Sequence, residues 1–170
     1  GVRGRKVTAS VALPGEQIRK QLHTTPQRME QYWRMSALGG VMSGSIGVQG
    51  HYANGLAALY LATGQDIANI GESNQCTTYN KVTREGDYYF SITMPAIIMA
   101  TYGGGTALPT QRECLEIMDC FGKGKALKLA EIAAGLVLAG ELSLGAATRV
   151  DKDTRKNERV DAHEMLGRNR

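Results

Sequence analysis

The segment HYANGLAALYLATGQD, residues 51–66, decides the fold of this chain. It predicts one helix that begins near His51 and ends at Gly64, because glycine commonly terminates helices. Apolar residues lie on nearly the whole circumference of this helix: Tyr52, Ala53, Leu56, Ala57, Leu59, Tyr60 and Leu61. We therefore expect the helix to be buried inside the protein rather than to lie on its surface.

Asp66 lies just past the predicted end of this helix. A carboxylate that a buried helix holds at this place is well positioned for chemistry. Asp is also a frequent N-cap, so Asp66 has a second interpretation as the cap of the next helical turn, residues 67–71. Spacing alone favours the cap, and the catalytic interpretation needs a further observation.

Three segments have the pattern of β-strands. Apolar and polar residues alternate in residues 6–13, which predicts a strand. Residues 76–82 and 87–94 predict two more strands, joined as a hairpin by the turn at 83–86.

Four further helices are expected between and after these strands. They span residues 16–22, 25–38, 106–118 and 125–147, with Thr25 and Thr106 as N-caps. The five glycines between residues 39 and 50 predict an irregular connection. The glycines at 103–105 predict a tight turn, and contact with a ligand is its second interpretation, since a helix N-terminus can hold an anion.

These elements predict an α+β fold in which a small antiparallel sheet packs against long helices. We expect residues 1–148 to form one domain and residues 149–170 to form a charged tail or flap. The 170 residues, 42% of them hydrophobic and 21% charged, are ordinary for one globular domain.

The charge pattern argues against nucleic-acid binding. The formal net charge is +4, and basic residues gather at both ends of the chain. Acidic residues are interleaved with them in the tail, and no aromatic residues accompany them as single-strand binding would require. A solvated charged tail is the simpler interpretation.

Composition also argues against a membrane or metal protein. The most apolar run, residues 132–140, is too short to span a bilayer, and no signal peptide is visible. Cys76, Cys114 and Cys120 lack the spacing of metal ligands, and we expect them to be reduced. We therefore expect a cytoplasmic protein without a bound metal.

A series of motifs, in order along the chain, resembles the 3-hydroxy-3-methylglutaryl-CoA (HMG-CoA) reductase family. The motifs are SGSIG at 43–47, HYANGLAALYLATGQDIAN at 51–69, SITMP at 91–95, GGGT at 103–106, LPTQ at 108–111, LAGELSL at 138–144 and HEMLGR at 163–168. The resemblance covers nearly the whole chain, but only the C-terminal part of a reductase. It implies the later half of the family's large substrate-binding domain and a dimer with active sites at the subunit boundary.

The resemblance also implies roles for five residues. Asp66 matches the catalytic aspartate, which tunes a lysine and a glutamate, and His163 matches the histidine that protonates the coenzyme A thiolate. His51 and Asn54 match residues that contact the substrate or the catalytic lysine. Arg34 lies one residue away from the position of a lysine that grips the substrate carboxylate. Each has a structural alternative: His163 as a surface histidine, and His51 and Asn54 as hydrogen-bonding residues at a helix start.

The segments that carry the family's catalytic glutamate, its catalytic lysine and its nicotinamide-binding module have no counterpart in this chain. We therefore expect no cofactor to bind this chain alone, and NADPH to bind only if the missing half is supplied. Because the chain begins at Gly1 rather than Met, we expect a processed, trimmed or split product.

Two functions remain open at this point. In the first hypothesis, the chain is a truncated relative repurposed as a non-redox enzyme, such as a cyclase or isomerase of secondary metabolism, or as a binding protein. Alternatively, it is a component of a reductase that converts HMG-CoA to mevalonate with NADPH. The expected partners are a small-molecule substrate and either further copies of this chain or a complementary reductase half.

Overall fold

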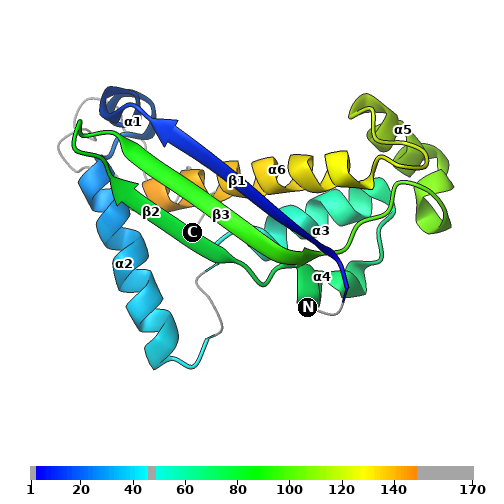
Figure 1. Ribbon diagram of the computed structural model, residues 1–170, viewed down its shortest axis with the longest axis horizontal. Coiled ribbons are helices and arrows are strands. Elements are labelled where there is room, and N and C mark those ends of the chain that lie inside the picture. The colour runs from blue at the N-terminus through cyan, green and yellow to red at the C-terminus, as the bar shows by residue number, and fades with distance from the viewer. Residues whose placement is uncertain (1–2, 46–48, 149–170) are drawn as a thin grey trace, which may run out of the picture.

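The computed structural model describes residues 3–45 and 49–148, and over this part the fold is α+β, as predicted (Figure 1). The strands are β1 (Arg5–Leu13), β2 (Thr77–Val82) and β3 (Tyr88–Ile97). The helices are α1 (Gly15–Leu22), α2 (Pro26–Met42), α3 (Tyr52–Thr63), α4 (Ile70–Ser73), α5 (Pro109–Ile117) and α6 (Ala126–Ala147). Short 3-10 turns span Ile67–Asn69 and Gly104–Ala107. The predicted tail, 149–170, lies outside the described residues.

The sheet is antiparallel, with β3 between β1 and β2. Alternate residues of β3 are fully buried: Tyr88, Phe90, Ile92 and Met94. This alternation fixes the register, because a slip of one residue would turn these side chains to the other face of the sheet. The predicted hairpin of β2 and β3 is confirmed, and its turn is closed by a hydrogen bond from Thr83 N to Asp87 O of 2.8 Å.

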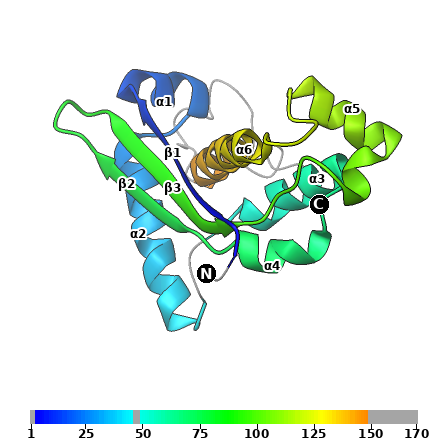
Figure 2. The same ribbon diagram turned by 45° about the vertical axis from the view of Figure 1, so that its right-hand side comes forward.

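Helix α6 is the central helix of the core. It runs along the buried face of the sheet, with α3 packed against it (Figures 1 and 2). Leu129, Ala133, Ala134 and Val137 of α6 are fully buried. By length and composition α6 could cross a membrane, but half of its most apolar window is buried inside the protein, as in the core helix of a globular domain.

The prediction that α3 is buried on all sides is wrong. Tyr52, Leu56 and Tyr60 are fully buried, but Leu61 is 64% exposed. The exposed face also includes alanines and Asn54. Among the described elements, α3 packs mainly on α5, α6 and the segment of α4, which cover one side of it.

Two predictions of helix boundaries are also wrong. Helix α2 continues through Gly39 and Gly40 to Met42 instead of ending at Leu38. Glycine within a helix costs only about 1 kcal/mol, so a few glycines do not suffice to end one. In Figure 1 this end of α2 projects beyond the sheet, and Met42 is 80% exposed.

Thr106 does not cap a helix, in contrast to the prediction. Its hydroxyl donates to Gly103 O at 2.7 Å within the 3-10 turn, and α5 begins only at Pro109. Thr25 is confirmed as the N-cap of α2, because its hydroxyl accepts from Arg28 N at 3.3 Å.

Candidate functional site

Asp66 lies at an open cavity of about 670 Å³ between the carboxyl end of α3 and the loop that follows β3. Its carboxylate accepts a hydrogen bond from Ala68 N at 3.0 Å and is exposed to solvent. The cap interpretation of Asp66 is therefore confirmed. A cap formed by one carboxylate oxygen leaves the side chain facing solvent, so the cap does not exclude a second role.

Close glycine packing and the Gln65 side chain build this end of α3. Gly64 ends the helix in the left-handed conformation, with φ +67°, and packs directly on the carbonyl of Gly105. The side-chain amide of Gln65 donates from Nε2 to Ala100 O at 2.8 Å and accepts at Oε1 from Ala100 N at 2.7 Å. These contacts fix the glycine turn against the helix end, so the prediction of a tight packing turn at 103–105 is confirmed.

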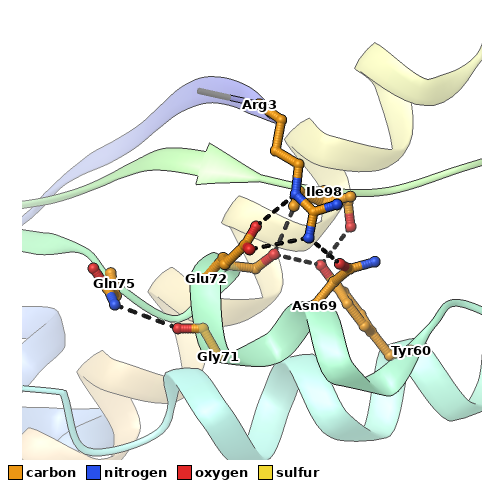
Figure 3. A network of polar contacts seen from close by, with 8 residues as sticks. Arg3, Tyr60, Asn69, Gly71, Glu72, Gln75 and Ile98 are labelled. Atoms are coloured by element: carbon orange, nitrogen blue, oxygen red, sulfur yellow. Dashed lines mark hydrogen bonds and ion pairs between the residues drawn. The ribbon is translucent and has the colours of Figure 1, made fainter. Parts of the chain in front are cut away.

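A polar network supports the same end from the other side (Figure 3). The hydroxyl of Tyr60 forms a hydrogen bond of 2.8 Å with Ser73 Oγ and donates to Ile98 O at 2.6 Å. Burial raises the pKa of Tyr60. Arg3 binds both carboxylate oxygens of Glu72, at 2.9 and 3.0 Å, which lowers the pKa of Glu72. The start of β1 is thereby tied to α4, close to Asp66.

His51 and Asn54 lie at the opposite end of α3. Asn54 is exposed, whereas His51 is partly buried and its Nδ1 has no hydrogen-bond partner among the described residues. The helix has 12 residues, so its two ends are about 18 Å apart. One copy of the chain therefore does not bring Asp66 together with His51 and Asn54.

Arg34 lies at a different cavity. This cavity, of about 400 Å³, lies between α2 and β2, and its lining includes Trp33, Cys76 and Asn80. The Arg34 guanidinium is 74% exposed and pairs with Glu30 at 3.4 Å. The structure does not bring Arg34 to Asp66, and His163 lies outside the described residues.

Comparisons with known proteins agree with the motifs. The family model of hydroxymethylglutaryl-coenzyme A reductase matches residues 1–168. The chain belongs to the hydroxymethylglutaryl-coenzyme A reductase family.

The chain matches only part of the length of its relatives in this family. The chain is 46% identical to the 3-hydroxy-3-methylglutaryl-coenzyme A reductase of Pyrococcus abyssi, over 98% of this chain and 41% of that protein. It is 42% identical to the reductase of Methanocaldococcus jannaschii, over 98% of this chain and 40% of that protein. It is 39% identical to the reductase of Schistosoma mansoni, over 88% of this chain and 16% of that protein. The chain thus spans about two-fifths of the length of its archaeal relatives.

The described part of this reductase-family chain has no group of three His, Cys, Asp or Glu side chains that could hold a metal ion. Cys76 is buried, and burial raises the pKa of its thiol. A reactive cysteine needs a lowered pKa and access to solvent, so Cys76 has the properties of a core residue.

One buried residue was not predicted from the sequence. Glu141, within LAGELSL, is fully buried at the amino end of α3. In the sequence, Glu141 directly follows the apolar run at residues 132–140. The pattern that could have indicated its burial is the helix period: Val137 and Gly145 lie four residues before and after Glu141, and both are buried, as is the adjacent Leu142.

Proposed function

We propose that this chain forms part of the active site of an HMG-CoA reductase, and that the catalytic glutamate, the catalytic lysine and the NADPH site come from a polypeptide equivalent to the missing half. The observation that supports this proposal most is that 98% of this chain matches only about 40% of the length of proteins named as this reductase. The relatives given above carry the name reductase, and none of them carries the name of a cyclase, an isomerase or a binding protein.

The cavity beside Asp66 does not suit the pyrophosphate of NADPH. The cavity beside Asp66 is lined by one carboxylate and by no Lys or Arg that could pair with a pyrophosphate. Gly105 of the glycine turn is packed against Gly64 and is closed to a ligand. We therefore assign the hydride donor to the missing half.

Asp66 supplies negative charge at the edge of an open cavity. Reduction of a thioester places negative charge on its oxygen, which a cationic or acidic donor has to stabilise. A lysine brought to this cavity would be held protonated by the Asp66 carboxylate, since a nearby opposite charge favours the charged form. His163, near the C-terminus, is proposed to protonate the departing thiolate, which suits a histidine near its ordinary pKa.

Two copies of the chain are needed for a complete site. Asp66 and Asn54 are separated by the length of α3, so one reacting group cannot contact both in the same copy. We assign Asp66 to one copy and His51 and Asn54 to the other, with sites at the boundary. The exposed apolar face of α3, which includes Leu61, suits burial by a partner.

Reconstitution tests the reductase function. The chain is purified alone and together with the N-terminal half of the Pyrococcus abyssi reductase, and NADPH oxidation is measured with HMG-CoA. We expect no turnover by either part alone and turnover by the complex. A complex that forms but does not turn over would overturn the proposal.

Mixing two inactive variants tests the shared site. Asp66→Asn and Asn54→Ala chains, each complemented with the missing half, are expected to be inactive. If each site uses both copies, random reassortment into dimers restores about a quarter of the parent activity, because half of the dimers contain one intact site. This recovery is expected if each site takes Asp66 from one copy and Asn54 from the other. No recovery from confirmed mixed dimers would mean that each site takes both residues from the same copy.

A further inference from the structure

Glu141 is a buried carboxylate without a cationic partner among the described residues. It lies on α6 and is 0% exposed. Its oxygens accept hydrogen bonds from three successive backbone N–H groups at the start of α3: Gly50 at 3.2 Å, His51, and Tyr52 at 3.1 Å. A side chain of α6 thereby closes the amino end of α3.

This arrangement replaces a local helix cap. The first N–H groups of a helix have no partner within the helix, and a Ser, Thr, Asp or Asn at the N-cap usually satisfies one of them. The N-cap residue of α3 is His51, whose side chain makes no capping bond. Glu141 satisfies three donors at once and places a negative charge at the positive end of the helix dipole.

Burial of a carboxylate is costly, so a local cap would be the less expensive solution. Desolvation raises the pKa of Glu141, although the three N–H groups lower it. Because the acceptor lies on α6 and the donors lie at the start of α3, these three hydrogen bonds also fix the position of α3 relative to α6.

The His51 side chain occupies the space between these two helices. A Cβ built on Gly140 would overlap the imidazole ring, and a Cβ on Gly55 would lie 2.5 Å from its Cε1 atom. The ring therefore lies in a slot that exists because both positions are glycine. Gly140 and Glu141 are adjacent, so the same turn of α6 holds both the ring and the backbone of His51.

We propose that Gly140 and Glu141 are positioning residues that fix the imidazole of His51 at the amino end of α3. The use of this imidazole in substrate binding depends on the proposed function, whereas its fixed position does not. The Nδ1 atom is buried against Gly140 and has no hydrogen-bond partner among the described residues, so packing against α6 holds this edge of the ring.

A double-mutant cycle tests the slot in the chain itself. Gly140→Ala is expected to lower the Tm by roughly 5–10 °C, because the new methyl group overlaps the ring. Gly135→Ala, on the same helix but with no atom within 4 Å, is the matched control and should leave the Tm unchanged or raise it slightly. In a His51→Ala background, most of the loss from Gly140→Ala should disappear. An equal loss in both backgrounds would overturn the slot.

Imidazole signals test Glu141. The chain has three histidines, so ¹⁵N signals of His51 can be assigned by comparison with His51→Ala. In Glu141→Gln, an NH₂ group faces backbone donors, and we expect the His51 signals to shift and broaden at a temperature where the variant is folded. Unchanged His51 signals with a lower Tm would show that Glu141 only caps the helix.

Kinetics of the reconstituted reductase separate the two proposals. Glu141→Gln is expected to raise KM at least about 10-fold with a smaller effect on kcat, since a displaced contact weakens substrate positioning. Shifted His51 signals with an unchanged KM would overturn the link to substrate while leaving the positioning intact. If the parent complex has no activity, the reductase proposal fails, and the cycle and the His51 signals still decide the positioning.

Discussion

The amino end of α3 is closed by a buried side chain from α6, whereas its carboxyl end is held beside an open cavity by close glycine packing and by the Gln65 side chain. At the amino end, Glu141 accepts three backbone hydrogen bonds and the His51 ring fills a slot. At the carboxyl end, Gly64 packs on Gly105, and Asp66 stays exposed. The first end depends on one charged group, and the second on a close contact between glycines and on uncharged polar side chains.

The carboxylates at the two ends of α3 differ in what they can do: Glu141 supports the structure, whereas Asp66 is open to other groups. The Glu141 carboxylate is fully buried and accepts three N–H groups, so it is out of reach of a substrate and acts only through what it holds. An exposed carboxylate with one N–H partner retains acceptor positions for other groups. Carboxylates at the two ends of one helix are thus suited to different tasks.

Gly64→Ala should have the largest effect on stability. The left-handed conformation costs a non-glycine residue about 1–2 kcal/mol, and overlap with the Gly105 carbonyl adds to this. We expect a loss of about 3 kcal/mol in the free energy of unfolding, measured by urea denaturation. Gly44→Ala is the control, because Gly44 has φ +73° and nothing within 4 Å. Equal losses for the two variants would show that the contact with Gly105 contributes nothing.

The elements of the sheet and of α3 could be predicted because local signals determine them. Alternation in β3 and the hairpin turn were sufficient for that pair, and Gly64 marked the end of α3 correctly. The exposure of Leu61 was not predictable from composition, because it depends on which other elements cover the helix. The end of α2 was missed for a related reason: glycines weaken a helix but do not determine where it ends.

The candidate site was predictable only in part. The motif located Asp66 at the helix end, and spacing indicated its cap. Arg34 was placed in the site by a motif, and the structure places it at another cavity. Glu141 was missed because its partners are 89 to 91 residues away in the sequence, and such pairing requires the fold.

The pH dependence of stability tests the amino end. Burial raises the pKa of Glu141 above its usual 4.5 in the folded state. The folded protein therefore holds this proton where the unfolded chain has released it. The resulting stability is fully present below the usual pKa and is lost as pH rises through the folded-state value. Unfolding measured over this range should show the parent losing stability relative to Glu141→Gln, and parallel curves would contradict this.

Tyr60→Phe tests the carboxyl end from inside the core. The variant removes the hydroxyl that bonds Ser73 Oγ and Ile98 O, and leaves the Ile98 carbonyl with one partner fewer. We expect a loss of about 1–2 kcal/mol in the free energy of unfolding. Tyr102→Phe, at the same cavity but 61% exposed, should have almost no effect. A similar loss in both variants would argue against the network as the support of this end.

Asp66 should have the smallest effect on stability and the clearest effect on activity. Asp66→Ala removes the cap of Ala68 N and should cost about 0.5–1 kcal/mol, because the capped turn is short and exposed. Asp66→Asn keeps an oxygen that can accept from Ala68 N, so its stability should equal that of the parent. If Asp66 only caps, the Asn variant is as active as the parent in the reconstituted enzyme. If its charge holds a lysine protonated, the Asn variant is folded and inactive, since the amide retains the hydrogen bond but not the charge.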